Sequence, residues 1–230
     1  MAQDLIIQAA NIEKSYGAGR SAVRVLRGID LSVRRGEILS IVGPSGAGKS
    51  TLLNIVGCLD GFDTGRLSLI GKDVTSFSVE NLATFRNLHM GFIFQMHNLL
   101  PEFDAVENII MPLLIRRVRR REAVKKAMPL LERFGLADRA AHKPGELSGG
   151  ECQRIAMCRA IIGAPEIILA DEPTGNLDSQ NSVLLINTLL ELGRENSATV
   201  IIITHNKEIA DMTGRTITLV DGRITKDSVN

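Results

Sequence analysis

Two glycine-rich motifs in this chain contain the residue types that bind phosphate. The first, GPSGAGKST, occupies residues 43–51, and the second, LSGGE, occupies residues 147–151. The first fits the pattern G-x-x-x-x-G-K-[ST], in which backbone N–H groups surround phosphate oxygens. A strand-like stretch before it and a helix-like stretch after it make an accidental glycine-rich turn a poor alternative. The sequence therefore predicts two separate phosphate-binding surfaces on one chain.

Each residue type in the first motif has its own use. Lys49 is expected to reach the β- and γ-phosphates of a nucleotide, and the Ser50 hydroxyl is expected to bind Mg²⁺. Backbone N–H groups and the positive end of the following helix supply the other contacts. The predicted binding loop consists of Gly43, Pro44, Ser45, Gly46, Ala47, Gly48, Lys49, Ser50 and Thr51.

Three polar residues follow strand-like apolar runs later in the chain. Asp171 and Glu172 come directly after the apolar residues 167–170, and His205 comes after IIIT. We expect Asp171 to hold Mg²⁺, partly through water, and Glu172 to face the γ-phosphate as general base or as a group that orients the attacking water. His205 is expected at the phosphates, because ligands of open α/β sheets bind at the carboxyl ends of strands. Surface or purely structural roles are the alternatives, and the positions at strand ends disfavour them.

The second motif has the features of an anion site at the start of a helix. Ser148, Gly149 and Gly150 precede the helix-like stretch 151–162 and would present free backbone N–H groups. One chain does not need two γ-phosphate sites for one nucleotide. A head-to-tail homodimer, in which each copy completes the other's site, removes this redundancy. We therefore expect an ATPase whose sites close only when two copies meet.

The predicted phosphate-binding and catalytic residues lie far apart in the sequence, so the fold must bring their segments together at one edge of a sheet. Apolar runs typical of strands alternate with stretches of helical spacing, and this alternation predicts an α/β fold with a mainly parallel sheet covered by helices on both faces. Asp221 and Gly222 are expected to turn a final hairpin. The predicted strands are 5–9, 25–33, 38–42, 66–70, 90–94, 167–170 and 199–204, and the predicted helices are 49–58, 79–88, 121–134, 149–162 and 179–195.

Length and composition narrow the class of protein. The chain has 230 residues, of which 44% are hydrophobic, and this is enough for one core. Lys plus Arg total 27 and Asp plus Glu total 26, so the net charge of +1 argues against nucleic-acid binding. No apolar stretch approaches the about 18 residues of a membrane span, so we expect a soluble protein that reaches a membrane only through a partner. Cys58, Cys152 and Cys158 are expected to be reduced thiols, buried or without a role.

In combination, these motifs make the chain similar to the ATP-binding cassette (ABC) ATPases over nearly its whole length. GPSGAGKST resembles the Walker A loop of that family, IILADE its Walker B strand and LSGGE its signature motif. The resemblance implies ATP and Mg²⁺ as ligands. It also implies a P-loop NTPase fold with a mainly parallel core sheet, an antiparallel β subdomain and an inserted α-helical subdomain. The single domain is expected over 1–230, with the helical subdomain at about 95–164 and the core and β subdomain at about 1–94 and 165–230.

The resemblance further implies roles for residues outside these motifs. Gln95 matches the Q-loop glutamine, expected to contact Mg²⁺ and to take part in catalysis, and Asp178 in GNLD matches the D-loop. Tyr16 falls where the family stacks an aromatic ring on adenine, although a single aromatic residue is more often part of a core. Glu151 ends the signature motif and is expected at the nucleotide with it. Cys152 follows where a polar residue is common in the family.

Residues 95–114 resemble one branch of the family, the LolD-type ATPases that power release of lipoproteins from the bacterial inner membrane. The run ADEPTGNLD is shared with the MacB-type exporters and with the cell-division ATPase FtsE, so an exporter ATPase and a regulatory division ATPase are alternatives. DNA-acting and ribosome-acting members are disfavoured, because the chain has neither a long coiled coil nor a second cassette. The resemblance implies integral membrane permease subunits docked near 95–114, and a peripheral location on the cytoplasmic face of the inner membrane.

Two groups of side chains in this region are candidates for contact with a membrane partner or the membrane. Leu99, Leu100 and Phe103 are expected to be exposed in a groove that receives a partner helix, with packing in an ordinary helical core as the alternative. A basic cluster is expected to be a solvated face, with contact to anionic lipid headgroups as the alternative. This cluster consists of Arg116, Arg117, Arg119, Arg120 and Arg121.

Overall fold

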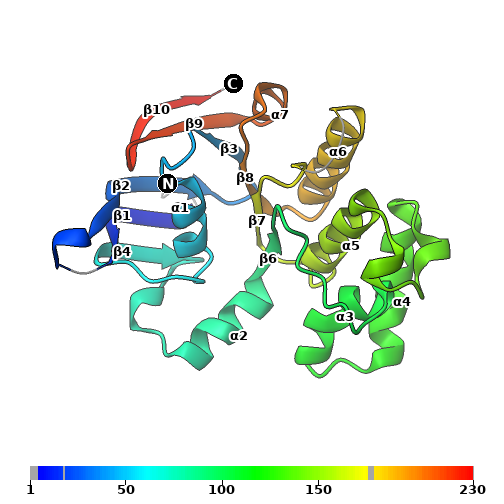
Figure 1. The fold of residues 1–230 in the computed structure, drawn as a ribbon. Coiled ribbons are helices and arrows are strands. Elements are labelled where there is room, and N and C mark those ends of the chain that lie inside the picture. Colours follow the sequence, from blue (N-terminus) through cyan, green and yellow to red (C-terminus); the bar gives the residue numbers. More distant parts are fainter. Residues whose placement is uncertain (1–4, 18, 176–178, 230) are drawn as a thin grey trace.

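A six-stranded sheet crosses the centre of the computed structural model, which describes residues 5–17, 19–175 and 179–229 (Figure 1). Its strands are β3 (Ile38–Val42), β6 (Met90–Ile93), β7 (Ile167–Asp171), β8 (Thr199–Ile203), β9 (Arg215–Val220) and β10 (Arg223–Val229). They lie in the order β10-β9-β3-β8-β7-β6, and every neighbouring pair except β9 and β10 is parallel. The predicted mainly parallel sheet and the final hairpin are confirmed.

A second sheet is antiparallel and holds the N-terminal strands. It contains β1 (Leu5–Tyr16), β2 (Val23–Arg34), β4 (Thr64–Leu69) and β5 (Lys72–Asp73) in the order β2-β1-β4-β5. The first strand runs well past the predicted end at residue 9. Asn11 has a φ of 50°, and the register shifts between Ala9 and Ile12. This irregularity interrupts the apolar alternation, although the pairing with β2 continues beyond it.

Seven α-helices cover the sheets in the part of the chain that the structure describes. They are α1 (Lys49–Val56), α2 (Val79–His89), α3 (Ala105–Ile115), α4 (Arg120–Arg133), α5 (Gly149–Ile161), α6 (Ser179–Glu195) and α7 (Lys207–Asp211). Short 3-10 helices occur at Gly19–Ser21, Val74–Ser76, Ala137–Arg139 and Pro144–Glu146. In Figure 1, α3, α4 and α5 gather at one end of the molecule, and the antiparallel sheet lies at the other end.

Two apolar clusters divide the core. One joins α1 to the antiparallel sheet and to one face of the central strands, and the other joins α3, α4, α5 and α6 to the opposite face. The central strands contribute to both clusters, because successive residues of a strand point to opposite faces. Cys58, Cys152 and Cys158 are free and buried, as predicted.

One helix of this second cluster had no predicted counterpart. The apolar residues 105–115 contain Pro112, which made a helix hard to recognise. The helix α3 begins with a capping box, in which Asp104 accepts a hydrogen bond from the Glu107 N–H and Glu107 accepts one from the Asp104 N–H. The spacing D-x-x-E before an apolar run was the sequence signal for this helix.

Candidate functional site

The phosphate-binding loop joins β3 to α1, and its backbone requires glycine at two positions. Gly48 precedes α1 with a φ of 100°, where a side chain is strained. At Gly43, an added Cβ atom would lie 2.0 Å from the Leu219 carbonyl oxygen, so a larger residue would force the loop away from β9. The Lys49 Nζ donates hydrogen bonds to the carbonyl oxygens of Gly43 and Pro44, each at 2.9 Å. The ammonium group is therefore held over the loop.

A cavity of about 550 Å³ opens beside this loop and collects the predicted polar residues from several strands. Because β3, β7 and β8 are parallel, their carboxyl ends meet at one edge of the sheet. The cavity is lined by Val25, Gly43, Ser45, Gly46, Gly48, Lys49, Ser50, Thr51, Gln95, Asp171, Glu172, Ile203 and His205. The structure therefore brings together the predicted phosphate loop, the glutamine after β6, both carboxylates after the apolar run of β7 and the histidine after β8.

Glu172 and His205 form a direct pair inside this cavity. The distance between Glu172 Oε1 and His205 Nδ1 is 2.9 Å, and the Glu172 side chain is only 17% exposed whereas that of His205 is 78% exposed. Glu172 has a φ of 45°, in the left-handed region, and its N–H donates to the Ile203 carbonyl oxygen at 3.0 Å. Left-handed backbone at a non-glycine residue is uncommon and often marks a functional site. The sequence predicted both residues but not their contact.

The signature motif forms the start of α5, outside the residues that line the cavity. The Ser148 Oγ accepts a hydrogen bond from the Glu151 N–H, and the Glu151 carboxylate accepts bonds from the N–H and the hydroxyl of Ser148. These two bonds, together with Arg139, lower the pKa of Glu151 to about 2. The Glu151 carboxylate is thus occupied in capping its own helix. Ser148 and Gly149 are exposed, so the motif faces outward rather than into the chain's own cavity.

A buried amide of α5 links two segments of the site and was not predicted. Gln153 is 4% exposed, and its Nε2 donates to the carbonyl oxygens of Phe94 and Pro173 at 3.1 and 2.8 Å. Phe94 directly precedes Gln95, and Pro173 directly follows Glu172. One side chain of the signature helix therefore fixes the backbone beside two residues of the cavity. A polar residue at a buried position of α5 was the only sequence signal for this role.

The environment of Tyr16 is polar, so the alternative of a core residue is wrong. Tyr16 is 43% exposed, and its hydroxyl donates to Asp60 Oδ2 at 2.6 Å. The Lys14 Nζ lies 2.9 Å from Asp60 Oδ1 and 4.8 Å from the centre of the Tyr16 ring. The hydrogen bond to Asp60 is the main cause of the raised pKa of Tyr16. Tyr16 does not line the cavity, and Asp178 lies outside the described residues.

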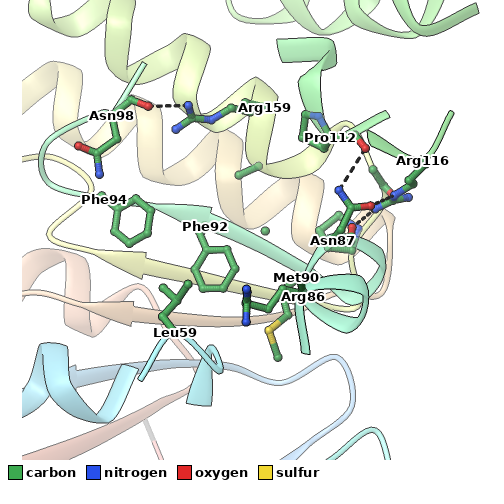
Figure 2. A pocket seen from close by; sticks show the side chains of 15 residues that line it. Leu59, Arg86, Asn87, Met90, Phe92, Phe94, Asn98, Pro112, Arg116 and Arg159 are labelled. Atoms are coloured by element: carbon green, nitrogen blue, oxygen red, sulfur yellow. Dashed lines mark hydrogen bonds between the residues drawn. The ribbon is translucent and has the colours of Figure 1, made fainter. Parts of the chain in front are cut away.

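A second cavity, of about 410 Å³, lies between α2, β6 and the facing parts of α3 and α5, and we call it the helical groove (Figure 2). Its apolar lining includes Leu59, Met90, Phe92, Phe94 and Pro165, and Figure 2 shows the two phenylalanine rings side by side. These rings are stacked with a centroid distance of 5.9 Å. The groove begins at the segment that follows Gln95.

The three residues expected to be exposed in a partner groove differ in their exposure to solvent. Leu100 and Phe103 are exposed, by 40% and 36%, in agreement with the prediction. The prediction was wrong for Leu99, which is half-buried and packs against the helical cluster. The buried Asn108 of α3 fixes the backbone of residues 100–103. Its side chain donates to the carbonyl oxygens of Leu100 and Phe103 and accepts a hydrogen bond from the Leu100 N–H. These bonds hold the loop against the helices.

The basic cluster is not one continuous solvated face. Arg117, Arg119, Arg120 and Arg121 are exposed, but Arg116 is half-buried, in contrast to the prediction. The Arg116 guanidinium donates to the carbonyl oxygens of Asn87 and Gly163 and to the Asn87 side chain. Arg116 therefore joins the ends of α2, α3 and α5. The spacing of the arginines did not distinguish this structural residue from its exposed neighbours.

Comparison with known proteins shows a family match that includes most of the residues of this site. The model of the ABC transporter family matches residues 26–175. The chain is 49% identical to the lipoprotein-releasing system ATP-binding protein LolD of Geobacter metallireducens over 222 residues, which is 96% of this chain and 99% of that protein. It is 50% identical to LolD of Porphyromonas gingivalis over 218 residues, covering 95% of this chain and 98% of that protein.

Solved structures agree with the observed fold. The ATP-binding cassette MJ0796, in a dimeric post-hydrolysis state bound to ADP and Pi, superimposes with a TM-score of 0.92 at 36% identity, covering 97% of this chain and 98% of that one. The cassette cbiO1 of Clostridium perfringens, at 23% identity, superimposes with a TM-score of 0.86 and supports the fold alone. Within the described residues, no helix is long and apolar enough to cross a membrane.

Proposed function

This chain belongs to the ABC transporter family of ATP-binding proteins, and on that premise we propose that it is the ATP-hydrolysing subunit of a bacterial lipoprotein-releasing transporter. The observation that carries the proposal is the shared cavity of the phosphate loop, Gln95, Asp171, Glu172 and His205. Relatives named as LolD proteins match it over almost their full length, which supports the lipoprotein-releasing branch over an exporter or a division ATPase. We further propose a peripheral location at the cytoplasmic face of the inner membrane, which the resemblance of its motifs to the ABC ATPases implies.

The loop and Lys49 bind the triphosphate in this proposal. The backbone N–H groups of residues 45–51, in the loop and the first turn of α1, surround the β-phosphate, because free N–H groups point toward the anion. The Lys49 ammonium is already held over the loop by two backbone carbonyl oxygens. Phosphate oxygens are stronger acceptors than these carbonyls, so the ammonium turns to the β- and γ-phosphates. Tyr16 is proposed to stack on adenine, with its hydroxyl anchored by Asp60.

The donor set of the cavity fits Mg²⁺. Ser50, Gln95 and Asp171 provide a hydroxyl, an amide and a carboxylate oxygen in the lining of the same cavity. Magnesium prefers oxygen ligands and retains several waters, so a few protein oxygens beside a triphosphate suffice. When bound, the ion supplies charge neutralisation of the phosphate oxygens. We propose Ser50 and Asp171 as its main protein contacts, with Gln95 beside them.

Glu172 and His205 are proposed to act on the reacting groups. The Glu172 carboxylate accepts a proton from the attacking water, and its partial burial beside β7 keeps it directed into the cavity. His205 lies 2.9 Å from that carboxylate and extends into solvent, where its imidazole can reach the γ-phosphate. The short contact orients both side chains before the nucleotide arrives. Preorganised groups of this kind reduce the cost of reaching the transition state.

The sites are proposed to close in a head-to-tail homodimer. Ser148, Gly149 and Gly150 form a helix start that does not line the chain's own cavity, and Ser148 and Gly149 are exposed. A second copy would place this anion-binding surface over the γ-phosphate. Asp178 of the D-loop is proposed to lie in the same contact. The similar cassette MJ0796 is dimeric, which supports the formation of a dimer.

The helical groove is proposed as the docking site of the membrane partner. Asn98 and Pro112 of the segment 95–114 line it, and so does the exposed apolar residue Leu59, at 46%. Met96, which is 69% exposed, lies in the sequence between the lining residues Phe94 and Asn98. Apolar grooves of this kind receive a partner segment through its apolar face. Gln153 connects the backbone beside this segment to that beside Glu172, so movement at the groove would reach the catalytic carboxylate.

Reconstitution tests the proposed function directly. The chain is purified with the integral membrane subunits that co-purify with it and placed in proteoliposomes that contain a fluorescent lipoprotein. ATP-dependent release of the lipoprotein to an acceptor is expected, and the complex carrying Glu172→Gln should release none. ATP hydrolysis without release, together with ATP-dependent expulsion of a small lipophilic compound, would instead establish an exporter.

A further inference from the structure

The helical groove has an unbalanced charge. Arg86, Arg116 and Arg159 line it together with apolar and amide side chains, and among the residues that the structure describes no aspartate or glutamate lines it. Figure 2 shows the three arginines around the apolar floor of Phe92 and Phe94. Within the described part of the chain, none of these guanidinium groups has a carboxylate oxygen within 4.0 Å. The groove is therefore apolar at its floor and positively charged at its walls.

The hydrogen-bond partners of these arginines are neutral. Arg159 donates to the carbonyl oxygens of Asn98 and His97 at 2.7 and 2.8 Å. Arg116 donates to the carbonyl and amide oxygens of Asn87 at the end of α2 and to the carbonyl oxygen of Gly163 after α5. Burial lowers the pKa of both guanidinium groups. Partly desolvated cations without counter-ions raise the free energy of the empty groove, and an incoming anionic group would offset that cost.

Arg86 uses fewer of its hydrogen-bond donors than Arg116 or Arg159. Among the described residues it makes one hydrogen bond, from Nη1 to the Cys58 carbonyl oxygen at 2.8 Å. An arginine has five N–H donors in a planar fork, so most of this fork is available to a carboxylate. Arg116 and Arg159 are instead committed to backbone carbonyls that hold the helices and the segment after Gln95.

We propose that the segment of the membrane partner that enters the helical groove carries a carboxylate, which pairs with Arg86 while an adjacent apolar side chain covers Phe92 and Phe94. This inference rests on the docking role proposed above and adds the chemical class of the partner segment. Arg116 and Arg159 strengthen the pairing through their positive field. A basic or purely apolar segment would leave three partly buried cations unpaired and would bind less tightly.

A charge series at Arg86 tests the proposal in the intact complex. The tagged chain is titrated onto its own membrane subunits in nanodiscs of zwitterionic lipid, and the dissociation constant is measured. Arg86→Gln retains a donor for the Cys58 carbonyl but loses the charge, and it should weaken binding about tenfold or more. Arg86→Lys should lie closer to the unchanged chain. The control Arg121→Gln makes the same charge change at an exposed position of α4 and should have little effect.

The ATP affinity of each isolated variant verifies its fold and should equal that of the unchanged chain. Equal binding by Arg86→Gln, Arg121→Gln and the unchanged chain would overturn the proposal. Equal weakening by Arg86→Lys and Arg86→Gln would also overturn it, because shape rather than charge would then decide binding. A charge swap tests the pairing directly. Arg86→Glu is combined in turn with the substitution of each aspartate or glutamate in the cytoplasmic loops of the membrane subunits by arginine. One of these substitutions should restore binding, and failure of all of them would contradict the pairing.

Photo-crosslinking separates this inference from the docking role on which it rests. Ala83 is exposed at the groove and can be replaced by a photoreactive phenylalanine analogue. A crosslink to a membrane subunit is expected. Its absence would reject docking in the groove itself. A crosslink combined with unchanged binding by Arg86→Gln would retain docking and reject only the carboxylate.

Discussion

At the scale of single residues, Glu172 combines a left-handed backbone with a side chain directed into a shared cavity. We expect Glu172→Gln to reduce turnover by about 10²-fold or more, because the amide cannot accept the proton of the attacking water. ATP binding should persist, since it depends on Lys49 and the loop N–H groups. Phosphate release and nucleotide binding, measured on the same preparation, check both expectations.

With hydrolysis blocked, ATP should also hold the Glu172→Gln variant in the closed dimer. Gel filtration with ATP and magnesium should therefore show a dimer, and without nucleotide a monomer. Glu208→Gln is a suitable control, because this acidic residue of α7 lies outside the cavity lining. A variant that stays monomeric with ATP would contradict the homodimer.

Lys49 provides the second prediction at this scale. Lys49→Ala removes an ammonium group that pairs with phosphate oxygens, and charge-assisted bonds of this kind contribute about 1.5–3 kcal/mol. We therefore expect ATP affinity to fall by about one to two orders of magnitude. Calorimetric titration measures the affinity. An unchanged affinity would mean that Lys49 does not contact the phosphates.

At the scale of elements, the helix α5 carries both the exposed signature and the buried Gln153. Gln153→Leu should reduce turnover more than ATP affinity, because it frees the backbone beside Gln95 and Glu172 while leaving the phosphate loop intact. It also leaves two carbonyl oxygens without a partner, at a cost of about 1–3 kcal/mol each, so the melting temperature should fall.

A matched variant in the same helix distinguishes coupling from loss of stability. Met157→Leu changes another buried residue of α5 with little change in volume and should retain near-normal turnover. Turnover is compared at a temperature where each variant is folded. Normal turnover by folded Gln153→Leu would show that the two hydrogen bonds only stabilise the helix.

At the scale of the whole molecule, the two phosphate-binding surfaces lie on different parts of one chain. If Ser148 completes the site of a second copy, Ser148→Arg should leave ATP binding by the monomer nearly unchanged. Its bulky cation should block closure over the partner's γ-phosphate, so hydrolysis and ATP-driven dimerisation should both be lost. Loss of ATP binding by the isolated variant would place Ser148 in its own chain's site instead.

Mixing two inactive variants sharpens this prediction. A dimer of one Ser148→Arg chain and one Lys49→Ala chain contains one site with both lesions and one site with neither. The intact site should restore part of the activity, measured as ATP hydrolysis over a range of mixing ratios. Activity that stays at the level of the separate variants would contradict sites shared between two copies.

Local sequence was sufficient for much of the fold and for the composition of the site. The strand before the phosphate loop, the helix after it and the strand that precedes Asp171 were predicted within a few residues, because glycine, β-branched residues and apolar periodicity act over short distances. Lys49, Ser50, Asp171 and Glu172 were predicted for the same reason. Their chemistry and their positions at element ends are local properties.

Other features depended on tertiary structure. The contact between Glu172 and His205, the two bonds of Gln153 and the neutral partners of Arg116 each join segments far apart in the sequence. The spacing of residues along the chain does not encode which distant carbonyl a buried donor will meet, because that depends on how helices pack on the sheet. The same packing half-buried Leu99 against the helices and produced the charged helical groove. The arginines of this groove come from three separate elements and become neighbours only in the folded chain.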